Sequence, residues 1–333
     1  MNLQDSKYSQ YALVQEMMGA VSAISCFDPA VAAPVAAAAA SRGHLLLTGE
    51  GSSRIMPAKN AIRKALTWGV KESVHTEGAI QSLDYKLNDY AVVLSSNSGR
   101  TKETLLLAKA LKAAGNEARF GVTANESTPL EAECNSTYVL RCGWERAVAA
   151  TKSVVEQVLF AEAVVRSLAG RAMDLEGLAA KVQTALTLPV EARFVEWACR
   201  ARTIYFAGLN DGVAEELTLK TNEITRRKSD FLEGTYALHG PEEVMQEGDV
   251  VFVVEPIESE YEKYKAVFGG AGVKVVAISP RPTPFDTILV PEAGELQQYV
   301  DLCAGWNLLV EIGVTLGINL DKPERARKVG NEM

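Results

Sequence analysis

A short apolar run passes into a polar loop at AVVLSSNSGRT, residues 91–101. The run AVVL has the length and the branched side chains of a buried strand, and the amphipathic segment 101–114 has the periodicity of a helix. A second transition of this kind occurs at LLLTGEGSS, residues 45–53. Strands that lead into helices through short loops are typical of an α/β fold with a parallel sheet covered by helices on both faces.

The same alternation occurs in two series along the chain. We expect strands at 45–47, 91–94, 120–123 and 138–140, and again at 203–207, 250–254, 275–278 and 288–290. The stretch Ser73–Glu77 is also strand-like but lies outside both series. The interval from Gly49 to Ser96 is 47 residues, and so is the interval from Gly208 to Glu255. This spacing predicts an internal duplication of one doubly wound unit, with a coincidence of common element lengths as the alternative.

The chain is long enough for two domains with cores of their own, at 333 residues. We expect N-terminal helices over residues 1–42, a first α/β domain over 43–172, a second over 190–320, and a C-terminal tail over 321–333. Helical periodicity runs from about residue 8 to 41, where Pro29 and Pro34 predict a division into two helices.

Composition and charge exclude several classes of protein. Hydrophobic residues make up 47% of the chain and charged residues 23%, which is ordinary for a globular protein and excludes a fibrous or disordered one. The net charge of −8 argues against a nucleic-acid partner. The five cysteines are widely spaced and form no CxxC pair, so we expect a reducing cytoplasm and no metal site. No targeting or membrane-spanning segment is visible, so we expect no membrane partner.

The loops after the first two expected strands of the first half are rich in hydroxyl groups and glycine. Each opens a helix, and the N-terminus of a helix favours an anion because its N–H groups and its dipole point toward it. A single loop of this kind is explained as well by helix capping, but two at one edge of a sheet favour an anion site. The corresponding second-half loop, EPIESE at 255–260, is acidic. Neither loop has a P-loop lysine or a complete dinucleotide motif, which disfavours ATP and NAD.

Two side chains in the second half are candidates for proton transfer. Glu223 lies on an expected helix, and His239 begins the turn His-Gly-Pro. A lone glutamate or histidine is usually structural. However, proton transfer between adjacent sugar carbons needs a carboxylate base, and ring opening needs a second group with a pKa near neutral.

These residues together resemble the sugar isomerase (SIS) domain proteins, specifically the double-SIS group that includes the isomerase half of glucosamine-6-phosphate synthase. The resemblance covers the chain from about residue 40 to its end. It is carried by SNSGRT at 96–101, AVAATK at 147–152, Glu223 sixteen residues before HGP at 239–241, and the tail DKPERARK at 321–328. It implies two tandem flavodoxin-like domains, with the tail closing over the active site.

The resemblance also implies a role for each matching residue. Glu223 matches the base that moves a proton between C1 and C2, His239 the ring-opening residue, and Lys328 a lysine that closes over the sugar. Positions that bind the anionic group or line and support the site are matched by Ser53, Ser96, Asn97, Ser98, Thr101, Glu145, Val148, Glu216 and Lys220. The family assembles its sites in a homodimer in which the histidine reaches the neighbouring subunit's site. No cofactor or metal is implied.

The expected function is isomerisation between aldose and ketose of a hexose with an anionic group at C6, most simply a phosphate. Deamination of an amino-sugar phosphate, or deglycation of a phosphorylated fructosamine, is the second hypothesis. It is weakened because Tyr236 stands where such relatives commonly have a glutamate, with Glu233 shifted back. A regulator that only binds a sugar phosphate is the third, disfavoured because both Glu223 and His239 are present. A sulfonate at C6 remains an alternative to phosphate.

Overall fold

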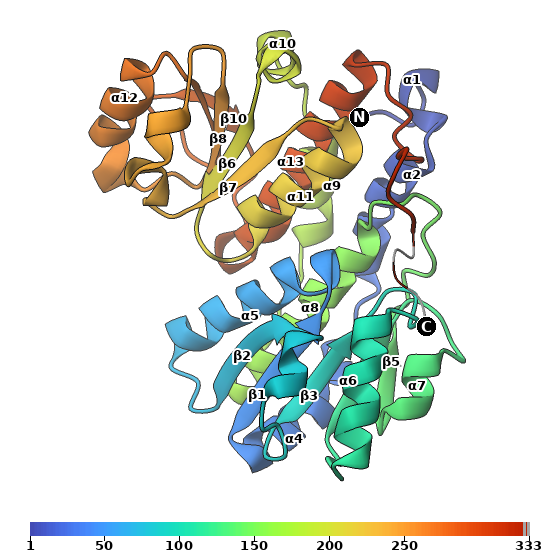
Figure 1. Cartoon of the computed structure of the whole chain (residues 1–333). Helices are drawn as coiled ribbons and strands as arrows, with labels where there is room; N and C mark the ends of the chain where they lie inside the picture. Colours follow the sequence, from blue (N-terminus) through green and yellow to red (C-terminus); the bar gives the residue numbers. More distant parts are fainter. Residues whose placement is uncertain (329–330, 332–333) are drawn as a thin grey trace. The chain divides into compact units, whose positions relative to one another are not determined.

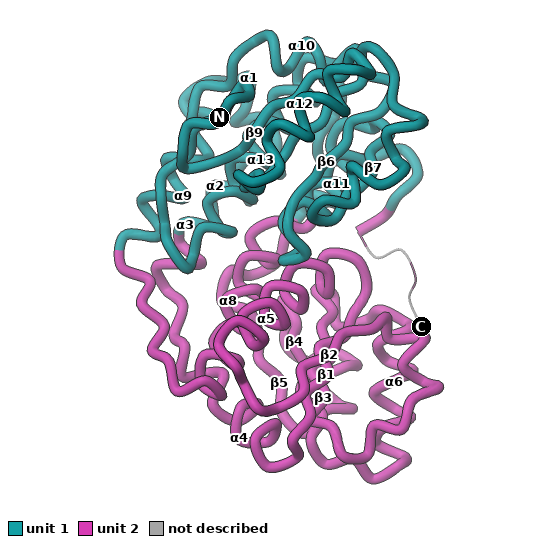
Figure 2. The backbone as a smooth tube through the Cα atoms, turned by 90° about the vertical axis from the view of Figure 1, so that its left-hand side faces the viewer, with its two compact units in different colours: residues 1–21, 146–149, 177–326 teal, residues 22–145, 150–176, 327–333 magenta. Residues whose placement is uncertain are grey.

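A computed structural model of the chain describes residues 1–328 and 331. The chain divides into two compact units (Figure 2). Unit 1 comprises Met1–Val21, Arg146–Ala149 and Gly177–Ala326, and unit 2 comprises Ser22–Glu145, Ala150–Glu176 and the described residues from Arg327 onward. The helices expected over 1–42 and the tail expected over 321–333 are therefore each divided between the units, and tail residues 329, 330, 332 and 333 lie outside the described residues.

Unit 2 is built on a parallel sheet with the strand order β2-β1-β3-β4-β5 (Figure 1). Its strands are β1 (His44–Gly49), β2 (Ser73–Gly78), β3 (Ala91–Ser95), β4 (Arg119–Thr123) and β5 (Ser136–Val139). Every residue of β3 and β4 is buried, whereas the edge strands β2 and β5 are partly exposed. The central strands are therefore the apolar runs that sequence alone identifies.

The helices of unit 2 cover both faces of this sheet (Figure 1). They are α4 (Ala33–Arg42), α5 (Ile55–Trp68), α6 (Lys102–Ala113), α7 (Pro129–Glu133) and α8 (Lys152–Leu168). Helix α8 is buried over almost its whole length and packs against α4 and α5. On α6, Leu105, Leu107 and Leu111 are buried against Val92 and Leu94 of β3. This packing fixes the start of α6 next to the end of β3.

Unit 1 repeats the arrangement with a second parallel sheet, in the order β10-β9-β8-β6-β7. Its strands are β6 (Ile204–Gly208), β7 (Ser229–Glu233), β8 (Val250–Val254), β9 (Lys274–Ser279) and β10 (Asp286–Leu289). Numbered within each unit, both sheets run second, first, third, fourth, fifth. The fold class expected from the sequence, two doubly wound α/β units, is confirmed.

The longest helix of unit 1 is α13 (Gln297–Thr315), which is buried along most of its length. The others are α1 (Ser6–Ser9), α2 (Ala12–Met18), α9 (Leu178–Thr187), α10 (Ala192–Arg200), α11 (Val213–Thr225) and α12 (Tyr261–Gly270), and α3 (Ala20–Ser25) crosses from unit 1 to unit 2. Within unit 1, α9, α10 and α11 contact α13. Among the described residues no single helix is long and apolar enough to cross a membrane, although the bent pair Ala12–Ser25 and Pro29–Arg42 reaches that length when counted together.

One strand differs from the expectations. β7 belongs to neither predicted series, because it reads Ser-Asp-Phe-Leu-Glu and only Leu232 of it is buried. It lies at the edge of its sheet, beside β6. An edge strand needs few apolar residues, since only part of its surface faces the core.

Candidate active site

The polar loops of unit 2 lie at the carboxyl edge of its sheet, where the strand order reverses. β1 and β3 are neighbours there, with Gly49 of β1 paired with Ser95 of β3. A Cβ atom on Gly49 would lie 2.6 Å from the carbonyl oxygen of Ser95, so only glycine permits this approach. In doubly wound sheets ligands bind at this reversal point. The two loops predicted to bind an anion are thus held side by side.

The loop of residues 95–101, here called the serine loop, is folded around its own hydroxyl groups. The Ser96 and Thr101 hydroxyl oxygens are 2.8 Å apart and hydrogen-bonded, and the Ser98 hydroxyl accepts from the backbone N–H of Arg100 at 3.1 Å. The Thr101 side chain makes no capping hydrogen bond to α6. The capping explanation therefore does not account for Thr101, and the loop has the form of an anion site at a helix N-terminus.

The turn of the serine loop depends on Gly99. Its φ of +65° lies in the left-handed region, and a Cβ atom there would come within 2.4 Å of Thr128. Its backbone N–H donates to the carbonyl of Ser96, and its own carbonyl accepts from Leu130 N–H. Both conformation and space thus require glycine at this position.

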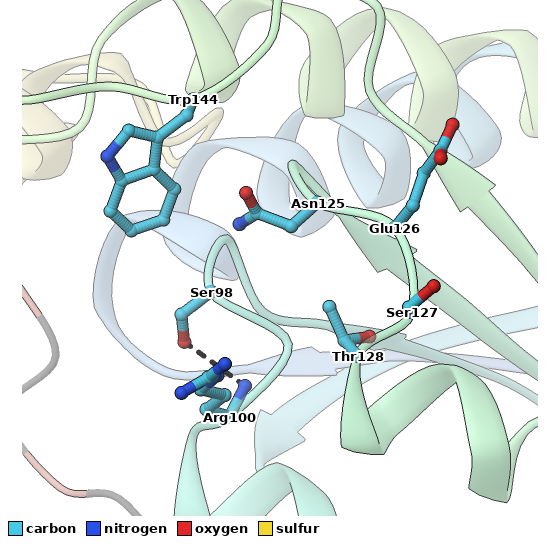
Figure 3. Close-up of a pocket in the computed structure, with 7 residues that line it drawn as sticks. All are labelled: Ser98, Arg100, Asn125, Glu126, Ser127, Thr128 and Trp144. Carbon is cyan, nitrogen blue, oxygen red and sulfur yellow. Dashed lines mark hydrogen bonds between the residues drawn. The ribbon is translucent and has the colours of Figure 1, made fainter.

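A cavity of about 530 Å³ opens beside the serine loop (Figure 3). It is lined by Ser98, Arg100, Asn125, Glu126, Ser127, Thr128 and Trp144. Asn125 and Thr128, which follow β4, and the exposed Trp144 are site residues that the sequence reasoning missed. Their signal was available, because 124–128 is a third polar loop after an expected strand.

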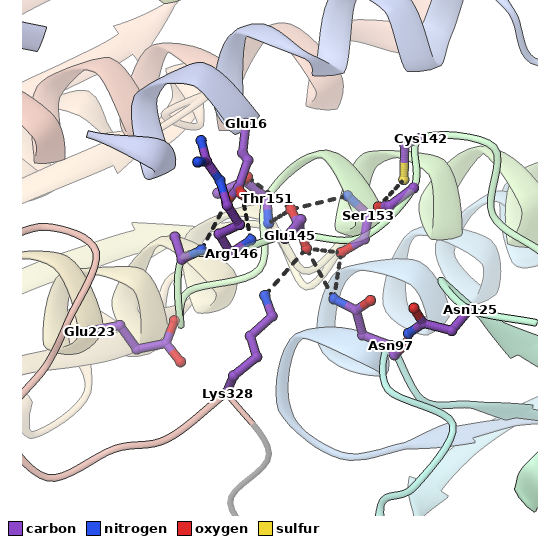
Figure 4. Close-up of polar contacts among 12 residues, drawn as sticks. Glu16, Asn97, Asn125, Cys142, Glu145, Arg146, Thr151, Ser153, Glu223 and Lys328 are labelled. Carbon is purple, nitrogen blue, oxygen red and sulfur yellow. Dashed lines mark hydrogen bonds and ion pairs between the residues drawn. The ribbon is translucent and has the colours of Figure 1, made fainter. Parts of the chain in front are cut away.

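Glu145 lies under this site as a fully buried carboxylate (Figure 4). One oxygen accepts from the Thr151 N–H at 2.7 Å and the Thr151 hydroxyl at 3.0 Å. The other accepts from the Ser153 hydroxyl at 2.5 Å and from the Asn97 side-chain amide at 3.0 Å. Glu145 thus ties the serine loop, through Asn97, to the start of α8. Since it is 0% exposed, it supports the site from beneath.

Lys328 of the tail reaches the same carboxylate. Its Nζ lies 3.6 Å from an oxygen of Glu145 and 5.5 Å from the centre of the Trp144 ring, and its side chain is mostly buried (Figure 4). Further along the tail, the carbonyl of Asn331 accepts from the N–H of Lys102, the first residue of α6. Within unit 2 the tail therefore lies beside the end of the serine loop, and Lys328 is held there by the negative charge of Glu145.

The pKa of Glu145 lies below its ordinary value. Burial alone would raise it, because a charged carboxylate loses hydration. The charge of Lys328 and the hydrogen bonds from Ser153 and Thr151 outweigh this effect. The carboxylate therefore stays ionised at neutral pH and keeps a partner for the lysine charge.

In unit 1, three charged residues lie on one face of α11. Lys220 is fully buried, and its Nζ lies 2.8 Å from Glu223 and 3.3 Å from Glu216. These residues are spaced three and four positions apart, which places them on the same side of a helix. Burial alone would lower the pKa of Lys220, but the charges of Glu223 and Glu216 outweigh it and raise that pKa. The Glu223 side chain is 24% exposed, so a base held by a buried cation faces the surface of unit 1.

The remaining predicted residues have the following places. His239 is exposed in the turn after β7, and in the described part of unit 1 no hydrogen bond or ion pair joins it to Glu223. Val148 is half-buried in unit 1, where its N–H donates to the carbonyl of Asp321 at the start of the tail. Ser53 is half-buried at the loop after β1.

The structure thus brings the predicted residues together in two groups. Unit 2 contains Ser53, Ser96, Asn97, Ser98, Thr101, Glu145 and Lys328, and unit 1 contains Val148, Glu216, Lys220, Glu223 and His239. Among the described residues no cluster of three or more His, Cys, Asp or Glu side chains is arranged to hold a metal ion.

No family model matches the chain. In sequence it is 26% identical over 266 residues to the isomerizing glutamine–fructose-6-phosphate aminotransferase of Leifsonia xyli. The matched stretch covers 71% of this chain and 43% of that relative. The enzyme of the same name from Neisseria meningitidis serogroup A is 27% identical over 267 residues, and the match covers 72% of this chain and 43% of that enzyme. The chain therefore spans less than half the length of these curated relatives.

Solved structures share the fold. The C-terminal domain of glucosamine–fructose-6-phosphate aminotransferase from Francisella tularensis has a TM-score of 0.76 at 19% identity, covering 95% of this chain and 99% of its own. The tagatose-6-phosphate ketose/aldose isomerase of Escherichia coli has a TM-score of 0.71 at 15% identity, covering 94% and 95%. The chain thus resembles the isomerizing aminotransferases in sequence, and it has the two-sheet fold of the sugar isomerase (SIS) phosphosugar isomerases.

Proposed function

We propose that the chain is an aldose–ketose isomerase of a hexose that carries an anionic group at C6, most simply a phosphate. The observation that carries the proposal is the pair formed by Glu223 and Lys220. A partly exposed carboxylate, held at 2.8 Å from a fully buried ammonium, is an oriented base. A protein that only binds a sugar has no need of such a base.

The first step assigned to the chain is binding of the anion. The serine loop offers hydroxyl groups and the start of α6, and the cavity beside it is large enough for a phosphorylated sugar end. Fixing the anion raises the effective concentration of the sugar carbons at the base far above that in solution.

The second step is proton transfer through an enediol. Glu223 removes the proton from C2 of the open-chain aldose, and the C1 carbonyl oxygen takes up the negative charge of the enediolate. The hydroxyl proton on the C2 oxygen passes to the C1 oxygen, and Glu223 returns its proton to C1 as the C2 oxygen becomes the ketone oxygen. A cationic side chain stabilises the charge that develops on the oxygens, a role we assign to Lys328 or Lys220. Such charge stabilisation by fixed cations is commonly worth a few kcal/mol.

Ring opening is assigned to His239. Its exposure within unit 1 supports a contribution to the site of a second copy of the chain, so we propose a homodimer. We also place the activity in the cytoplasm, which the five free cysteines of the described chain support.

The test is proton NMR of the purified protein with fructose 6-phosphate, glucose 6-phosphate, glucosamine 6-phosphate and a phosphorylated fructosamine. Interconversion of an aldose and a ketose supports the proposal. Release of ammonia or of a free amino acid moves the assignment to a deaminase or a deglycase. Binding of these sugars with no turnover would contradict catalysis and favour a regulator.

A further inference from the structure

Trp144 contributes an aromatic ring to the described lining of the cavity beside the serine loop. Its side chain is 43% exposed, although tryptophan is among the residues that proteins bury most. In Figure 3 the ring lies across the cavity from Ser98 and Arg100. Binding sites for small molecules combine such rings with a few polar groups. The exposed ring is therefore a surface that a ligand can cover.

The loop that carries Trp144 is fixed on both sides of it. Before it, the N–H groups of residues 141–142 donate at 2.7 Å to the buried carboxylate of Glu156. After it, Glu145 is hydrogen-bonded to the start of α8. The Nζ of Lys328 lies 5.5 Å from the centre of the ring, within the range of a cation–π contact. The ring is held in place without being buried, so a ligand that packs on it orders little of the protein.

The polar groups of the cavity suit a neutral group that carries hydroxyls. Arg100 and Glu126 are exposed and bring one positive and one negative charge, so the charges of the lining cancel. Among the described residues neither of them forms a salt bridge. The Asn125 side-chain N–H donates to the Asn97 carbonyl at 3.3 Å, which leaves its side-chain oxygen as an acceptor. A hydroxyl group donates and accepts, so it can use both the guanidinium and the amide oxygen.

The place of the cavity indicates which part of a sugar it takes. Ser98 belongs to the serine loop and also lines the cavity, so a group in the cavity lies next to an anion bound by that loop. In a hexose with an anion at C6, the next group is the sugar ring. One face of a pyranose ring presents mostly C–H bonds, and packing this face on an indole removes apolar surface of both from water.

We propose that Trp144 is the platform on which the closed ring of the sugar binds, with Arg100 and Asn125 as hydrogen-bonding partners of its hydroxyl groups. The proposal rests on the proposed function in one respect, that the serine loop binds the C6 anion. It narrows the substrate class to a hexose that enters the site as a ring. It also makes Trp144 a residue that determines specificity for the sugar, beyond its anion.

The test uses three ligands that cannot be isomerised. Methyl glucopyranoside 6-phosphate has a ring that cannot open, glucitol 6-phosphate has an open chain, and methyl phosphate has the anion alone. Their dissociation constants are measured by calorimetry with the full chain. An aromatic contact is strong enough that we expect the ring ligand to bind roughly ten-fold more tightly than the other two. It should also shift the tryptophan emission to shorter wavelength, which methyl phosphate should not do.

The matched variants are Trp144→Ala, Trp144→Phe and, as control, Tyr85→Ala, an exposed aromatic residue of unit 2 that does not line the cavity. Trp144→Ala is expected to bind all three ligands within about two-fold of one another, at the wild-type affinity for methyl phosphate. Trp144→Phe keeps an aromatic face, so it should keep most of the preference but lose the shift in emission. The control should behave as the wild type. Circular dichroism checks folding.

Equal binding of the ring and open-chain ligands by the wild type, or a preference for the ring that survives in Trp144→Ala, would overturn the proposal. Weaker binding of methyl phosphate by Trp144→Ala, to the same extent as of the ring ligand, would also overturn it, because the effect would then lie at the anion. None of these ligands is turned over. A preference that depends on Trp144, with no isomerisation of any sugar, would therefore reject the proposed function while the platform stands.

Discussion

Glu145→Gln removes one charge from the buried centre of unit 2 and nearly preserves its shape. In the native chain both carboxylate oxygens face donors: Thr151 N–H at 2.7 Å, the Ser153 hydroxyl at 2.5 Å and the Asn97 amide at 3.0 Å. A glutamine would point its own N–H groups at some of these donors, and it would remove the negative charge that lies 3.6 Å from Lys328 Nζ. Because loss of one partner from a buried network is strongly destabilising, we expect the opening free energy around α8 to fall by about 3 kcal/mol at pH 7.

The pH dependence follows from the lowered pKa of Glu145. A carboxyl group whose pKa is lower in the folded state stabilises that state above its unfolded pKa, here an ordinary glutamate value of about 4.3. This contribution is lost as the pH falls through the folded-state pKa. The difference between wild type and Glu145→Gln should therefore be largest at neutral pH and narrow below about pH 4.

The assay is native-state amide hydrogen exchange, read on peptides from α8, with Glu117→Gln as control. The Glu117 side chain is 72% exposed, and its replacement should change the opening free energy by less than about 0.5 kcal/mol. The reasoning would be refuted if Glu145→Gln lowered the opening free energy of α8 at pH 7 by no more than about 1 kcal/mol beyond the effect of the Glu117→Gln control. A loss of opening free energy that stays the same below about pH 4 would refute it as well.

Three further predictions concern single residues. Gly49→Ala places a Cβ 2.6 Å from the Ser95 carbonyl, so we expect about 1–3 kcal/mol of destabilisation and a lower Tm; an unchanged Tm would contradict the close approach. Ser96→Ala removes the hydroxyl bonded to Thr101, and steady-state kinetics should show KM for the C6-anionic sugar raised roughly ten-fold with kcat nearly kept; a loss in kcat alone would argue against anion binding. Lys220→Met removes the cation that lies 3.3 Å from buried Glu216, so Tm should fall at pH 7. The pKa of Lys220 is raised in the folded state, so its charge stabilises that state fully below the unfolded pKa of about 10.4, and this contribution is lost only at higher pH. A difference in Tm between wild type and Lys220→Met that disappeared by pH 9 would contradict this.

The central strands that are buried throughout, β3, β4, β6 and β8, are all among the strands that the sequence predicts. β3 and β8 are continuous runs of apolar residues, and burial on both faces requires that pattern. β7 escapes prediction because one buried leucine is enough for an edge strand, and its polar residues resemble a loop. Periodicity therefore identifies the centre of each sheet better than its edges.

Those predicted site residues that are close in sequence also lie close together in the structure. Ser96, Ser98 and Thr101 lie in one loop of six residues. The Ser96 and Thr101 hydroxyl groups are hydrogen-bonded there, and the Ser98 hydroxyl accepts from the backbone N–H of Arg100. The role of Glu145 was less visible. Its buried carboxylate contacts Asn97 and Lys328, which are far away in sequence, and no local sequence pattern predicts these contacts.

The basic run that follows α11 shows the same difference. The run Arg226-Arg227-Lys228 reads in sequence as the solvated end of a helix, where cations suit the helix dipole. Arg226 instead holds the tail at the carbonyls of Asn319 and Lys322. These carbonyls are 93 and 96 residues away in sequence, so no local pattern encodes the contact.

Deuterium exchange at C1 and C2 tests the central claim, that Glu223 moves a proton through an enediol. The wild type and Glu223→Gln are incubated in D2O with fructose 6-phosphate and glucose 6-phosphate, and proton NMR follows loss of the C1 or C2 signal. Calorimetry checks that the variant still binds the sugar. The account predicts exchange in the wild type and a loss of at least about a hundred-fold in a variant with intact binding. Exchange that proceeds equally in Glu223→Gln would contradict it.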